Sequence, residues 1–182
     1  MMAGHFAFAA MVKSREKQLP LWSLMLASQW LDVIFVPLFV AGVERMSAAP
    51  GTSGYGSGVF VIPYTHSLAG ALALSVLLAI PFFFAWGRRA ALVLGGVVFS
   101  HWVLDLVVHR PDLEVVPGVY VGLGLWRVPA AAIALELAMV LLGSWLYWRA
   151  AASVTTAQKA RLAGGAVLVA GIVTLALNAA GF

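Results

Sequence analysis

The sequence contains no cysteine and few charged residues. The absence of cysteine excludes disulfide bonds, thiolate metal ligands and cysteine nucleophiles, and it leaves the redox compartment open. Charged residues make up 10% of the chain, against about a quarter in an ordinary soluble domain. Hydrophobic residues make up 63%, and the mean hydropathy is +0.98. This composition also excludes a disordered chain, because such chains lack the apolar surface needed for collapse.

Five apolar runs are long enough to cross a bilayer, for which a helix needs about 20 mostly apolar residues. They extend from Leu21 to Val43, Thr65 to Trp86, Ala90 to His109, Val128 to Trp148 and Leu162 to Ala180. The connecting segments are short and no internal repeat is detectable. The sequence therefore predicts an all-α fold, a polytopic membrane helix bundle of about five transmembrane helices in a single integral membrane domain, 1–182. Pro37 and Pro81 lie inside two of the runs and are expected to kink them.

The N-terminal stretch from Met1 to Val12 is apolar but too short to span a bilayer, and no basic residue precedes it. It is therefore expected to be neither a signal peptide nor a full transmembrane helix. Two alternatives remain open. The first is a short half-helix that enters the bundle, and we include it in the predicted fold. The second is an amphipathic helix in the membrane interface.

The basic residues are distributed unequally between alternate loops. Eight of them fall on one side: Lys13, Arg15, Lys17, Arg88, Arg89, Arg149, Lys159 and Arg161. Three fall on the other: Arg45, Arg110 and Arg127. Because cytoplasmic loops carry the excess of Lys and Arg, the first side is predicted to be cytoplasmic and the C-terminus to lie outside. This topology signal explains the net charge of +4, so no nucleic-acid partner is expected.

Carboxylates and histidines occur within the predicted membrane segments. The three acids are Asp32, Asp105 and Glu136, and the four histidines are His5, His66, His101 and His109. A charged side chain at the bilayer centre costs at least about 2.5–3.5 kcal/mol, and no Lys or Arg lies within the same spans. Several imidazoles with carboxylates and no thiols suggest a divalent cation, with zinc as the first candidate.

The spacing of His101 and Asp105 strengthens this interpretation. Residues four apart lie on one face of a helix, so both side chains can bind one ion, and His109 follows four residues later. Simpler interpretations remain for four residues. His5 is an interfacial side chain, and His109 caps a helix end or faces water. His66 lies in a first helical turn with Thr65 as its cap, and Glu136 is protonated and bonded to a neighbouring helix.

Four short motifs carry a family resemblance. They are Gly4-His5, Gln29-Trp30-Leu31-Asp32, Thr65-His66-Ser67-Leu68 and the stretch from Ser100 to Asp105. In this order and spacing they resemble the YdjM-like family of bacterial inner-membrane metal-dependent hydrolases, over about residues 4–112. The C-terminal helical pair, about 126–182, contributes only hydropathy. The resemblance implies five metal ligands: His5, Asp32, His66, His101 and Asp105.

One part of the family pattern is absent. The family often carries His-Arg-Gly just before Thr-His-Ser, and Ile62-Pro63-Tyr64 stands there in this chain. The missing arginine weakens the case for a phosphoester held by a guanidinium group.

The leading functional hypothesis is a metal-dependent hydrolase of the inner membrane. A zinc-like ion would lower the pKa of bound water to about 7. Asp105 and Glu136 are the expected catalytic carboxylates, with Glu136, or whichever carboxylate is not a ligand, as general base. The expected partners are membrane lipids and an amphipathic or lipid-like substrate that carries a phosphoester, ester or amide.

Two other function classes stay open. Intramembrane acids and histidines also mark proton or metal-ion pathways, which would make the protein a transporter. Polar residues also hold helices together, which would suit a noncatalytic accessory subunit with a membrane-complex partner, or a homo-oligomer.

Overall fold

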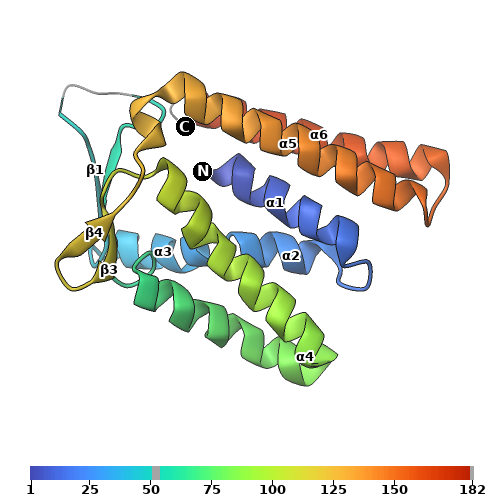
Figure 1. Ribbon diagram of the computed structural model, residues 1–182, viewed down its shortest axis with the longest axis horizontal. Coiled ribbons are helices and arrows are strands. Elements are labelled where there is room, and N and C mark those ends of the chain that lie inside the picture. Colours follow the sequence, from blue (N-terminus) through green and yellow to red (C-terminus); the bar gives the residue numbers. More distant parts are fainter. Residues whose placement is uncertain (51–53, 181–182) are drawn as a thin grey trace.

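Helices make up most of the computed structural model, which describes residues 1–50 and 54–180 (Figure 1). Within this part of the chain the α-helices are α1 (Met2–Arg15), α2 (Leu21–Ser28), α3 (Trp30–Val40), α4 (Leu68–Val108), α5 (Pro129–Ala152) and α6 (Ala157–Ala179). A short 3-10 helix, η1 (Leu125–Arg127), precedes α5. The predicted all-α class is therefore confirmed.

Three of these helices, α4, α5 and α6, are long and apolar enough to cross a membrane. The pair α2 and α3 also qualifies if it is counted as one span, although the two helices meet at a bend of 48°. The predicted count of five spans is thus not confirmed, because two of the predicted runs belong to the single helix α4. The first run bends at Gln29, between α2 and α3, rather than at Pro37, which lies within α3.

The helix α4 changes direction at Gly87, whose φ of 83° and ψ of 177° are not helical. Such a positive φ favours glycine because it has no Cβ to clash with the backbone. Figure 1 shows the result, a hairpin of two arms that meet at one end of the bundle. The arms approach closely, since a Cβ placed on Gly95 would lie 3.3 Å from the Ser75 carbonyl oxygen.

The N-terminal helix α1 lies inside the bundle, between the pair α5 and α6 and the layer formed by α2 and α4 (Figure 1). Its buried residues are small: Ala3, Gly4, Ala7, Ala9 and Ala10, together with His5. A Cβ placed on Gly143 of α5 would lie only 2.5 Å from the Ala7 carbonyl oxygen. The close approach of small residues is a common way for membrane helices to pack. The N-terminal stretch is therefore a short helix within the bundle rather than a helix on its surface.

Two antiparallel hairpins close one end of the bundle. β1 (Arg45–Ala48) pairs with β2 (Gly58–Val61), and β3 (Leu113–Val116) pairs with β4 (Val119–Val121). The opposite end carries the α1–α2 turn, the fold in α4 and the α5–α6 turn (Figure 1). An ion pair between Arg89 Nη2 and Glu16 Oε1, 2.9 Å long, links two of these turns. The hairpins were not predicted from the sequence.

We expect Gly143→Ala to destabilise the protein by about 1–3 kcal/mol, because the new methyl group would push α5 away from the α1 backbone. Gly165→Ala on α6 is the matched control, since nothing lies within 4 Å of a Cβ at that position. Thermal unfolding in detergent should show a lower midpoint for the first variant only. Equal midpoints would contradict the close packing of α1 against α5.

Candidate metal centre

The structure brings together all five residues that the family resemblance implies as ligands. His5 comes from α1, Asp32 from the first turn of α3, and His66 from the segment just before α4. His101 and Asp105 come from the second arm of α4. These side chains are far apart in the sequence, and four of them line one cavity together with Phe60 of β2.

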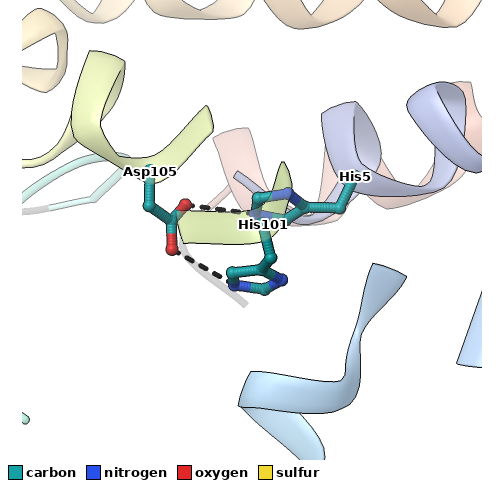
Figure 2. A group of neighbouring side chains, drawn as sticks. All are labelled: His5, His101 and Asp105. Carbon is teal, nitrogen blue, oxygen red and sulfur yellow. Dashed lines mark hydrogen bonds and ion pairs between the residues drawn. The ribbon is translucent and has the colours of Figure 1, made fainter. Parts of the chain in front are cut away.

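Asp105 is the centre of the cluster, and imidazoles face both of its carboxylate oxygens. His5 Nε2 lies 3.1 Å from Oδ1, and His101 Nε2 lies 3.1 Å from Oδ2 (Figure 2). His66 Nε2 and His109 Nε2 each lie 3.7 Å from Oδ2. The Asp105 side chain is only 3% exposed, so these imidazoles provide the polar surroundings that the lipid and the core cannot.

Asp32 approaches the same imidazoles from another helix. Its Oδ1 lies 3.4 Å from His66 Nε2 and 3.7 Å from His101 Nε2. The Asp32 side chain is 35% exposed, in contrast to Asp105. Asp32 is therefore the carboxylate of the cluster that is reached most easily from outside.

The break between α2 and α3 orients His101. Ser28 is the last residue of α2, and the carbonyls at a helix end lack intrahelical partners. The Ser28 carbonyl accepts a 2.7 Å hydrogen bond from His101 Nδ1. With its proton on Nδ1 held by the carbonyl, His101 presents Nε2 to the two carboxylates, and metal-bound histidines are usually oriented in this way.

A buried relay orients His66 in the same way. The Thr65 hydroxyl donates to Glu44 Oε2 at 2.7 Å and accepts from His66 Nδ1 at 2.7 Å. Glu44 is fully buried, and its Oε1 also accepts from the Thr65 amide. The alternative that made Thr65 a helix cap is wrong, because Ser67 caps α4 and its Oγ accepts from the Gly70 amide.

His109 is the C-cap of α4, as one alternative supposed, and its amide donates to the Asp105 carbonyl at 2.8 Å. Its ring is buried beside Asp105 rather than facing water. The side chain is 4% exposed, and its Nδ1 lies 2.9 Å from Asp112 Oδ1. Asp112 Oδ2 in turn accepts from the Phe60 amide of β2 at 3.1 Å. The loop that follows α4 thus supplies a carboxylate behind His109, while His109 Nε2 points toward Asp105.

Glu136 on α5 is bonded to α1 and to the loop between β1 and β2, and its role as general base stays a prediction. It is fully buried, its Oε2 accepts from the Gly4 amide at 3.1 Å, and its Oε1 accepts from the Tyr55 hydroxyl. The Gly4 amide belongs to the first turn of α1, whose N–H groups lack intrahelical acceptors. Burial and the Glu136 carboxylate raise the pKa of Tyr55. Glu136 therefore holds the start of α1, one residue before His5, so the bond to a neighbouring helix that the alternative expected is present.

A cavity of about 100 Å³ adjoins the cluster. Its polar walls are Asp32, His66, His101, Asp105 and His109, and its apolar walls include Phe35, Phe60, Ile62 and Trp126. A larger depression of about 580 Å³ shares Asp32, Phe60 and Trp126 with it and extends over the β1–β2 hairpin. Because one water occupies about 30 Å³, the smaller cavity has room for an ion together with water.

The spacing of the ligand atoms suits a divalent metal ion. Two ligands of a tetrahedral zinc ion, each about 2.0–2.1 Å from the metal, lie about 3.4 Å apart. The four distances that join His66 and His101 to Asp32 and Asp105 range from 3.1 to 3.7 Å. In each of two groups, all ligand atoms lie within 4.8 Å of one another: His5, His101 and Asp105, and Asp32, His66 and His101. The cluster has the donors and geometry to bind a metal.

Comparisons with known proteins found no matching family model, no matching curated protein and no matching solved structure. Four contributors were missed in the sequence: Ser28, Glu44, Tyr55 and Asp112. Two of them could have been noticed in the sequence. Asp112 follows His109 by three residues at a predicted helix end, and Glu44 stands directly after the first apolar run.

We expect Thr65→Val to weaken metal binding by about 10- to 100-fold, because it removes the hydroxyl that holds His66 Nδ1. Thr65→Ser keeps the hydroxyl and should bind almost as the native chain does. Thr155→Val, at an exposed turn, controls for the loss of a threonine. Competition titrations with a zinc chelator in detergent measure the affinities, and unchanged affinity in Thr65→Val would contradict the relay.

Proposed function

We propose that the protein is a membrane-embedded metal-dependent hydrolase, as its resemblance to the YdjM-like family implies. The observation that carries this proposal is the buried His/Asp cluster, which opens through Asp32 to a cavity and then to a wider depression. Intramembrane ionisable groups of this number are costly unless they serve a function.

The proposed arrangement in the inner membrane has five crossings: the bent pair α2–α3, the two arms of α4, and α5 and α6. The arms of α4 on either side of Gly87 are roughly 28 and 31 Å long at 1.5 Å per residue, close to the bilayer core of about 30 Å. The basic turns would face the cytoplasm, and the hairpins and the C-terminus would lie outside. The opening of the cluster would then face the outer half of the bilayer.

The residues of the cluster have distinct proposed roles. His66, His101 and Asp105, with His5 on the second oxygen of Asp105, would hold the divalent ion, for which zinc is the first candidate. Such an ion polarises a scissile bond and acidifies water. Asp32, which is partly exposed and lines the cavity, would accept the proton of the attacking water. Glu136, whose two oxygens are already bonded, would position α1 instead.

The depression next to the cluster supports an amphipathic substrate. Its walls combine apolar side chains, including Met46, Phe60 and Trp126, with polar ones such as Ser57 and Tyr55. A lipid-like molecule could place its chain against the apolar walls and its phosphoester, ester or amide beside Asp32. Membrane lipids surround this end of the bundle in the proposed arrangement, so the substrate could enter from the bilayer.

We expect about one or two divalent ions per purified native chain and almost none in His101→Ala and Asp105→Ala. Mass spectrometry of the metals in detergent-purified protein measures this after growth with zinc and manganese. Glu114→Gln, a carboxylate of the β3–β4 hairpin, is the matched control and should keep its metal. A native chain without metal, or a His101→Ala chain with stoichiometric metal, would overturn the proposal. Asp32→Asn should keep metal but lose hydrolysis of ester, amide and phosphoester lipids.

A second function is favoured by one observation, the break between α2 and α3 beside Asp32. Discontinuous helices of this kind form ion sites in transporters. If the protein carried metal ions, proteoliposomes would accumulate radioactive zinc, and Asp32→Asn and Asp105→Asn would abolish uptake while Glu114→Gln would not. For the hydrolase we expect no uptake above that of empty liposomes.

A further inference from the structure

His109 and Asp112 have the geometry of a metal ligand and its supporting carboxylate. Histidines that bind metals usually donate the other ring N–H to a carboxylate or carbonyl, which fixes the tautomer and the ring orientation. In this chain His109 Nδ1 lies 2.9 Å from Asp112 Oδ1, and Nε2 lies 3.7 Å from Asp105 Oδ2. The same pattern, with an oxygen behind Nδ1 and carboxylate ahead of Nε2, holds for His66 and His101.

Packing alone does not account for this arrangement. His109 lies against the rings of Phe60 and Trp126, with ring centroids 4.9 and 4.4 Å away. An apolar side chain would fill that space without burying two polar nitrogens and a carboxylate. His109 also lines the cavity of about 100 Å³ with Asp32, His66 and Asp105, so its Nε2 is directed at the space where an ion would sit.

His109 differs from His66 and His101 in the carboxylates that it contacts. Nε2 of His66 and of His101 lies within 3.7 Å of both Asp32 and Asp105. The His109 ring instead contacts Asp105 and Asp112, and His109 belongs to neither group of ligand atoms that are all within 4.8 Å of one another. His101 lies four residues before Asp105 on α4, and His109, the C-cap of α4, lies four residues after it; both face Asp105 Oδ2, at 3.1 and 3.7 Å. Asp105 is thus placed between two positions for an ion.

We propose that the centre binds two divalent ions bridged by Asp105, the second of them held by His109 with Asp112 behind it. This proposal rests on the metal site of the proposed function and adds a second ion to it. Two-metal sites hold ions about 3.5–4 Å apart and stabilise both the attacking and the leaving oxygen. With His109 and Asp105 as its protein ligands, the second ion would keep positions open to the cavity for substrate or water.

The test counts Mn²⁺ ions, added as the probe to metal-depleted protein in detergent. Equilibrium dialysis should find two ions per native chain, and electron paramagnetic resonance should show a spin-coupled pair. His109→Gln should bind one ion with the spectrum of isolated Mn²⁺. Glu114→Gln is the matched control, because Glu114 lies on the β3–β4 hairpin and does not line the cavity, and it should keep two coupled ions.

The outcomes separate this proposal from the one on which it rests. A native chain with one ion that His101→Ala loses would overturn the second ion and leave the hydrolase site standing, and a native chain with no ion would overturn both. Two coupled ions in His109→Gln would also overturn the second ion. If His109→Gln fails to fold, Asp112→Asn provides the test. This variant should lose about 10- to 100-fold in affinity for the second ion and keep its affinity for the first. Unchanged affinity in that variant would refute the supporting role of Asp112.

Discussion

The arrangement of this bundle depends on a carboxylate that must be buried among apolar helices. Asp105 lies on the second arm of α4 with a side chain that is 3% exposed. An ionised carboxylate in such surroundings is costly unless it is paired or coordinates a metal. Four imidazoles, from α1, the segment before α4, and α4 itself, lie within 3.7 Å of its oxygens. The helices that carry these imidazoles are thereby held in one relative position.

The surrounding helices in turn determine how each imidazole points. The break after Ser28 frees a carbonyl for His101, the relay from Glu44 through Thr65 orients His66, and the loop after α4 brings Asp112 behind His109. His5 differs, because its Nδ1 is buried and has no hydrogen-bond partner among the described residues. Its position depends instead on its stacking with His101, at a centroid distance of 3.7 Å, and on α1. Glu136 and the close contact at Gly143 fix that helix.

Several features could be predicted from local patterns. The helical class followed from long apolar runs, and the pairing of His101 with Asp105 followed from their spacing on one helix. The predicted count of five spans is not confirmed: the runs divided at Arg88 and Arg89 form the single helix α4, which reverses at Gly87, and the first run breaks at Gln29. The capping position of His109 followed from the helix end, but the placement of its ring between Asp105 and Asp112 did not. A sequence reports spacing along one element and cannot report which side of a ring faces another element.

The sequence by itself determined that the chain is an apolar helical bundle with acids and histidines where lipid-facing residues would be expected. These properties follow from composition and from the 3.6-residue period, both of which are local. Only the tertiary structure decided that α1 lies inside the bundle and that Glu136 accepts a hydrogen bond from the first turn of α1. It also decided that Asp32 and His66 meet His101 and Asp105. Such contacts join segments up to 132 residues apart, and they depend on how small residues let helices approach, on where helices break, and on which buried polar groups find partners.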